Sequence, residues 1–171
     1  MGAFSKNAAL LALGLWLGCA IFFGAVAAPT IFNPDVAGGV DRGVLGAISG
    51  AMLRRVYFIT YITIGIATFF LLIASIGESK GAKGTRWALV LCLLVLGINA
   101  ISDLWIANKL NKLKMGMTNS HSSEATALKM EFDSWHARAT WIYQAAVLCG
   151  GLGAILLLPA GTAAKGKKSS K

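Results

Sequence analysis

The sequence predicts an all-α integral membrane protein, a four-helix bundle with a short extra helix between spans 1 and 2. Four apolar runs, near residues 8–32, 56–76, 87–107 and 139–159, are separated by charged segments. Each run is about 20 residues or longer, enough to cross a hydrocarbon core roughly 30 Å thick at about 1.5 Å per helical residue. Backbone amides in lipid must bond internally, so we expect these runs to be helices.

The composition supports this fold class over a soluble bundle. Of the 171 residues, 56% are hydrophobic and only 13% are charged, and the mean hydropathy is +0.67. Segment 88–101 reads ALVLCLLVLGINAI, in which Asn99 is the only polar residue, whereas a soluble amphipathic helix would carry a polar face. We therefore expect one four-span domain over 1–161 and a basic, disordered tail over 162–171.

The first span and the connection after it are marked by Pro29 and Pro34, which stop a helix. The first run also resembles a signal peptide, but it exceeds the usual apolar core of about 7–15 residues, so we expect a retained span. Residues 36–54 alternate glycines with aliphatic residues at helical spacing. Two interpretations stay open for this segment: a re-entrant or closely packed helix, or a surface helix leading into span 2. The aligned glycines are Gly39, Gly43, Gly46 and Gly50.

Charged and aromatic residues mark the remaining span ends. Arg54 precedes span 2, Lys109 follows span 3, and a helix is expected to begin near Ser123 and run through Trp135 into span 4.

The 16 Lys and Arg residues divide equally between the two sides of the membrane, so the positive-inside rule does not choose an orientation. The basic tail favours cytoplasmic termini. We expect a multi-pass protein of the cell membrane, the inner membrane if the chain is bacterial.

The net charge of +9 would suggest nucleic acid as the partner of a soluble protein. Here the basic residues flank the spans, where they meet anionic lipid headgroups. The expected partner is the lipid bilayer, with other membrane subunits as an alternative, and not nucleic acid.

One acid at membrane depth is the first candidate for a functional group. Asp103 lies near the end of span 3, and Asn99 lies four residues earlier on the same helix face. An ionisable group at this depth is costly and is usually paired or in contact with water. His136 and Arg138 begin span 4 about 200° apart on their helix, so Asp103 can approach one or the other. The candidate pocket residues are Asp103, Asn99, His136, Arg138, Arg55 and Tyr57.

This group of residues has two interpretations. The functional one is a polar pocket at one membrane face, and the structural one is an interfacial salt bridge that fixes helix packing. The chain would accordingly be a membrane protein of unassigned activity that binds or moves a small solute or ion through the pocket. The alternative is an accessory or structural subunit of a larger membrane complex.

Nothing in the sequence supports catalysis, a metal or a cofactor. The only histidines are His121, in a polar connection, and His136, so a bis-histidine haem has no matched pair of ligands. Nucleophile-elbow, phosphate-loop, CxxC and HExxH motifs do not occur. Cys19, Cys92 and Cys149 each lie in a different apolar run, and we expect them to be small buried hydrophobes. We predict that the protein is not an enzyme.

Short motifs along the chain resemble a known family. Similar stretches in the first span are Trp16-Leu17-Gly18, Val26-Ala27-Ala28-Pro29 and Ile31-Phe32. Further stretches are Gly50-Ala51-Met52-Leu53 with Arg55 and Tyr57, and Phe132 with Trp135-His136. This pattern resembles the domain-of-unknown-function (DUF) 4149 family, related to transmembrane protein 205. Trp135 stands where that family usually has Leu, and Ala139 where Ser is common.

The resemblance implies a four-span fold and a membrane location, without an assigned reaction. It also implies that Pro29, Arg55, Tyr57 and His136 lie on one membrane face. Asp103 falls on this same face by the independent argument from span 3.

Overall fold

The computed structural model describes residues 2–77, 83–119 and 122–158, and every regular element in these ranges is a helix. Four of these helical stretches are long and apolar enough to cross a membrane, which confirms the predicted fold class. The predicted tail, 162–171, lies outside the described residues. Span 1 comprises α1 (Gly2–Phe22), the π-helical turn η1 (Phe23–Ala27) and α2 (Ala28–Phe32); α3 (Pro34–Ala37) follows it. The remaining spans are α4 (Arg42–Gly77), then α5 (Lys83–Ile101) with η2 (Ser102–Ile106) and α6 (Ala107–Asn119), and finally α7 (Ser122–Leu157).

The short extra helix between spans 1 and 2 is α3. The Asn33 side chain caps it by accepting a hydrogen bond from the Asp35 amide at 3.0 Å. Gly38 and Gly39 then turn the chain with φ angles of 54° and 82°, which suit glycine. From Arg42 the backbone runs without a break into span 2. The glycine-rich segment therefore includes a helix leading into span 2, and not a re-entrant one.

Side chains from all four spans form one core. Its members include Leu13 and Trp16 of α1, Ile64 and Leu71 of α4, Cys92 and Val95 of α5, and Leu157 of α7. Of the three cysteines, Cys92 is buried as predicted, but Cys19 is exposed, so the prediction is wrong for that residue. A second, smaller core of Phe23, Ala27 and Val56 joins only the first two spans.

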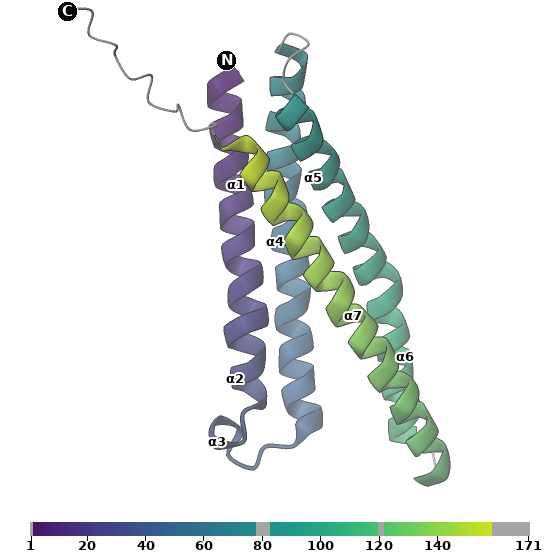
Figure 1. The fold of residues 1–171 in the computed structure, drawn as a ribbon. Coiled ribbons are helices and arrows are strands. Elements are labelled where there is room, and N and C mark those ends of the chain that lie inside the picture. Colours follow the sequence, from purple (N-terminus) through teal and green to yellow (C-terminus); the bar gives the residue numbers. More distant parts are fainter. Residues whose placement is uncertain (1, 78–82, 120–121, 159–171) are drawn as a thin grey trace, which may run out of the picture.

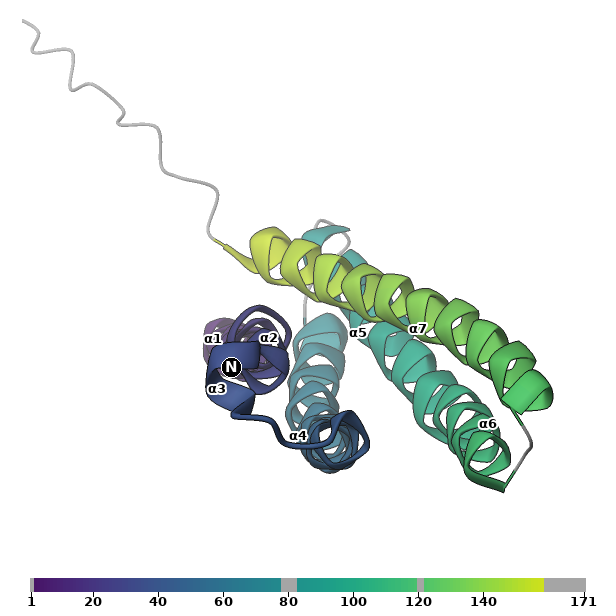
Figure 2. The same ribbon diagram turned by 90° about the horizontal axis from the view of Figure 1, so that it is seen from below.

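The bundle forks below this common core. α4 packs against α1 and α5, while α6 packs along α7 and barely touches α4. Figures 1 and 2 show the resulting pairs, α1–α2 with α4 and α6 with α7, diverging toward the end that carries α3. The second pair is held by an edge-to-face contact between Trp105 and Trp135, with ring centroids 5.4 Å apart, and by the Lys109–Glu131 ion pair at 2.8 Å.

Two of the helices that reach the forked end are longer than the hydrocarbon core of a bilayer is thick. α4 and α7 each have 36 residues, or about 54 Å of helix against a hydrocarbon core of roughly 30 Å. The beginning of α1 and the end of α7 lie together at the opposite, unforked end (Figure 1).

Candidate functional site

Polar groups from all four spans meet where the bundle divides. Ala20, Tyr61, Asn99 and Tyr143 lie 14 to 17 residues, or roughly 21–26 Å, from the unforked end of their span. This distance is shorter than a hydrocarbon core of roughly 30 Å is thick. Polar groups at similar heights on four helices can interact with one another. They form a polar layer at the level where the bundle divides.

Asp103 is the only acidic residue of this layer, and it contacts span 2. The Tyr61 hydroxyl donates a hydrogen bond of 3.5 Å to the Asp103 carboxylate, and Asp103 is half-buried. Tyr57, one turn from Tyr61, is 9% exposed and lies near both residues. Within the described ranges, no ion pair involves Asp103. The carboxylate therefore faces tyrosines and no cation.

Asp103 also lies in a break of the α-helical hydrogen-bond pattern. It belongs to η2, and such π-helical turns are rare and occur often at functional sites. The other turn, η1, has a local cause: Pro29 lacks an N–H and would clash with the carbonyl of Ala25 in an α-helix. No proline lies in or near η2. Its irregular backbone is thus not explained by local chain chemistry.

Tyr143 closes the opposite side of the layer. Its hydroxyl donates a 2.8 Å hydrogen bond to the Ala20 carbonyl, just before η1, and so ties α7 to α1. Tyr143 also lies near Tyr57. The chain has three tyrosines, and all of them therefore lie at the point where the helix pairs separate.

The Asn99 side chain has a buried hydrogen-bond donor without a partner among the described residues. It is 7% exposed, lies one turn from Asp103 and faces Tyr61, but its Nδ2 meets no acceptor with hydrogen-bond geometry. An unsatisfied buried polar group costs about 1–3 kcal/mol. We name the five residues Tyr57, Tyr61, Asn99, Asp103 and Tyr143 the fork site.

The structure brings together half of the predicted pocket. Asp103, Asn99 and Tyr57 belong to the fork site, whereas His136, Arg138 and Arg55 are exposed. His136 stacks on Phe132 at 5.9 Å, and the Arg138 guanidinium lies 5.1 Å from the centre of the Trp135 ring. The expected approach of Asp103 to His136 or Arg138 is not present in the described ranges, because α7 meets the third span through Trp135.

Sequence reasoning did not select Tyr61 and Tyr143 as site residues. Tyr61 lies four residues after Tyr57 and so shares its helix face, which was a usable signal. Tyr143 shares a helix face with Thr140 and His136 by its spacing, but the sequence did not indicate its partner, a backbone carbonyl 123 positions away. Groups of three or more potential metal ligands are absent from the part of the chain that the structure describes. The absence of a metal and of a cofactor stays a prediction.

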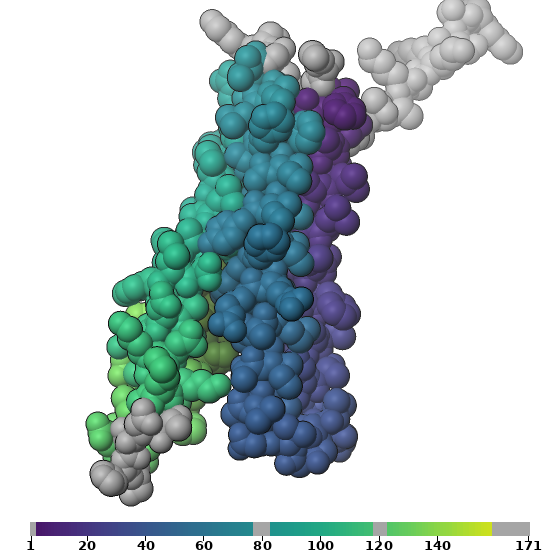
Figure 3. Space-filling model, turned by 180° about the vertical axis from the view of Figure 1, so that it is seen from behind, coloured from purple at the N-terminus to yellow at the C-terminus, as the bar shows by residue number. Residues whose placement is uncertain are grey.

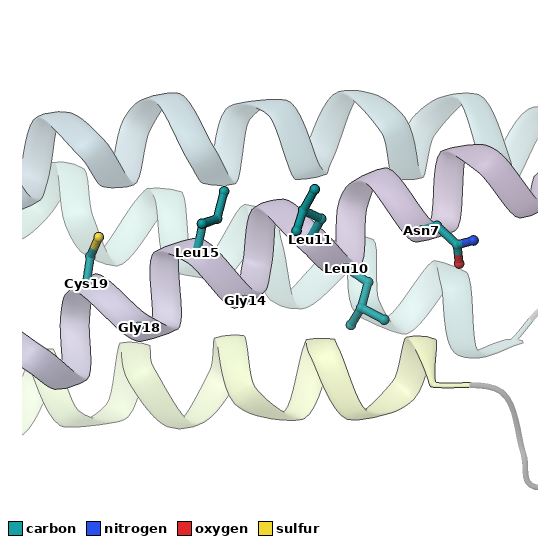
Figure 4. Close-up of a pocket in the computed structure, with 7 residues that line it drawn as sticks. All are labelled: Asn7, Leu10, Leu11, Gly14, Leu15, Gly18 and Cys19. Atoms are coloured by element: carbon teal, nitrogen blue, oxygen red, sulfur yellow. The ribbon is translucent and has the colours of Figure 1, made fainter.

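A separate groove of about 700 Å³ runs along the outer face of α1. Figure 4 shows Gly14 and Gly18 between Leu11 and Leu15 on the side of α4 and Leu10 on the side of α7. A Cβ atom at either glycine would meet no atom within 4 Å. The groove is apolar apart from Asn7 and lies on one helix, so it is a packing surface and does not extend the fork site.

Comparison with known proteins identifies the family of this chain but does not indicate an activity. No curated protein and no solved structure matches the chain. A family model described as Domain of unknown function (DUF4149) matches residues 11–119. The match spans the first three membrane helices and four of the five fork-site residues, while Tyr143 and the stretch around His136 lie beyond it. The chain therefore belongs to the DUF4149 family.

Proposed function

We propose that this multi-pass membrane protein binds or moves a small cation at Asp103 and is not an enzyme. The supporting observation is a half-buried carboxylate, on a helical stretch apolar enough to span a membrane, that faces tyrosines and pairs with no cation among the described residues. We place the protein in the cell membrane, the inner membrane in a bacterium.

The chemistry of the fork site suits a cation better than an anion. An unpaired carboxylate in a low-dielectric environment is unfavourable, and a bound cation removes that cost. Tyrosine rings attract cations through their faces, and their hydroxyl oxygens accept hydrogen bonds. The exposed Arg55 and Arg138, which could attract anions, lie outside the fork site.

Asp103→Asn is expected to abolish cation binding. Purified protein would be titrated with monovalent cations, from sodium to tetraphenylphosphonium, at constant ionic strength while its unfolding temperature is followed. A bound cation at a hundredfold excess over its Kd stabilises the folded state by about 2.7 kcal/mol. We expect at least one cation to raise the unfolding temperature of the native protein and to lose that effect in the variant.

Asp133→Asn is the matched control, because it removes the same charge from an exposed acid paired with Lys129 at 2.7 Å. It should keep the response to cations. The proposal is wrong if no cation stabilises the native protein, or if the Asp103 variant responds as the Asp133 variant does.

The groove on α1 supports a second candidate function, that of a subunit in a membrane complex. Glycines four residues apart let a second helix approach closely. The open space at Gly14 and Gly18 shows that no helix of the described chain uses this face.

Under this second function, Gly14→Leu is expected to release a membrane partner. Native mass spectrometry after mild detergent extraction would compare it with Gly97→Leu, a change at another exposed glycine with open space around it. The complex should be lost in the first variant and kept in the second. A native chain that is always a lone monomer would exclude the subunit function.

A further inference from the structure

Beside Asp103 the fork opens sideways. α6 packs along α7 and barely touches α4, and the space-filling view in Figure 3 shows a hollow between α4 and α6 with α7 behind it. The Tyr61–Asp103 contact lies at one end of this crevice. At the other end, the Lys114 ammonium donates to the Gly43 carbonyl at 3.4 Å. Asp103 can thus be approached laterally, between two helices.

The protein surface flanking Asp103 and Tyr57 is apolar. Leu104, next to Asp103, is 70% exposed, and Phe58, next to Tyr57, is 65% exposed. Trp105, on the other side of the same turn, is 62% exposed. Exposed tryptophans are typical of the membrane boundary, where an apolar body meets lipid and the N–H meets water. The sideways route therefore leads to lipid.

The water-facing side of the fork carries positive charge. Arg54 lies three residues before Tyr57 and seven before Tyr61, on the same face of α4 and about 10 Å nearer the α3 end. Arg54, Arg55 and Lys112 are exposed there. A hydrated cation coming from the water would meet these like charges before it reached Asp103. On the lateral route, the Lys114 ammonium lies at the far end of the crevice, while the end next to Asp103 is flanked by the apolar side chains of Leu104 and Phe58.

From these observations we infer that the cation of the fork site is an organic amphiphile, with a single positive group and an apolar body, that reaches Asp103 sideways from the bilayer. This inference rests on the proposed function and specifies its ligand. The carboxylate would balance the charge, and the tyrosine rings and apolar flanks would contact the body. Small inorganic ions would bind poorly, because they lose hydration without gaining apolar contact.

The test compares two probes of equal charge. Equilibrium dialysis would measure the binding of tetraphenylphosphonium and of tetramethylammonium to the full chain in lipid nanodiscs. Empty nanodiscs would correct for partition into lipid. We expect tetraphenylphosphonium to bind at least about tenfold more tightly, the difference that roughly 1.4 kcal/mol of extra apolar contact supplies.

Three variants make the outcome decisive. Asp103→Asn should lose tetraphenylphosphonium binding by at least about tenfold, Asp103→Glu should retain it because the charge stays, and Asp133→Asn should match the native chain. Equal or tighter binding of tetramethylammonium would overturn the amphiphile inference and leave cation binding at Asp103 intact. Tetraphenylphosphonium binding that is unchanged in Asp103→Asn would overturn the inference too. Binding of neither probe would overturn the amphiphile inference, and the unfolding assay with sodium would then test cation binding at Asp103 separately.

Discussion

Replacing Gly150 with valine is expected to separate α7 from α1 and to destabilise the whole bundle. Gly150 is buried, and a Cβ atom there would overlap the ring of Trp16, which is itself in the common core. Overfilling a packed interior costs about 1–3 kcal/mol and occasionally more. We expect the upper end of this range, because the blocking atoms belong to a rigid indole ring.

The neighbouring glycine supplies the control. A Cβ atom at Gly151 would meet nothing within 4 Å, so Gly151→Val makes the same chemical change on the same helix without the overlap. Unfolding in mixed detergent micelles would give the stability of both variants. Gly151→Val should stay within about 0.5 kcal/mol of the native chain. Equal losses in the two variants would mean that α7 does not pack on Trp16 in the way described.

The second large effect is expected for Trp16→Ala. Trp16 is 3% exposed, and its Nε1–H donates a 2.9 Å hydrogen bond to the Thr60 hydroxyl, which in turn donates to the Val56 carbonyl at 2.8 Å. Truncation of a buried tryptophan to alanine costs about 3–5 kcal/mol. The same unfolding assay should show a loss in this range.

Two further substitutions separate the contributions to this effect. Trp16→Phe keeps most of the ring and removes the donor, so it should cost much less than Trp16→Ala, with about 1 kcal/mol assigned to the hydrogen bond. Trp141→Ala removes a tryptophan that is 73% exposed and should change the stability little. If Trp141→Ala proved as harmful as Trp16→Ala, burial would not be the source of the effect.

The two sites should also be coupled. With Trp16 truncated, the ring that Gly150→Val would overlap is gone, so the double variant should lose less stability than the sum of the two single losses. This coupling would place the two side chains in contact within the folded bundle.

The helical spans were predictable because lipid allows few alternatives. A run of about 20 apolar residues must be helical in a bilayer, and four such runs gave the fold class. Helical periodicity then placed Asn99 and Asp103 on one face of span 3. The same rule relates Tyr57 to Tyr61, although the sequence alone did not indicate that Tyr61 contacts the acid.

Partners across helices were predicted less well. His136 and Arg138 are exposed, because α7 presents Trp135 to Trp105. Cys19 and Cys92 both lie in apolar runs. Cys92 is buried, whereas Cys19 is exposed because it lies on the face of α1 that does not pack against the other helices. In a membrane span both faces are apolar, so hydropathy does not distinguish the packed face from the lipid-exposed one.

The amino-acid sequence by itself determined the number of candidate spans, the helical fold, the family and the place of Asp103 near the end of the third apolar run, because these follow from hydrophobic length and from motifs along one chain. Tertiary structure alone decided that the bundle forks at that place, that three tyrosines from two spans meet there, and that Asp103 faces Tyr61 in place of a cation. The physical reason is that helix rotation and divergence depend on side-chain packing between segments far apart in the chain, which no local periodicity records.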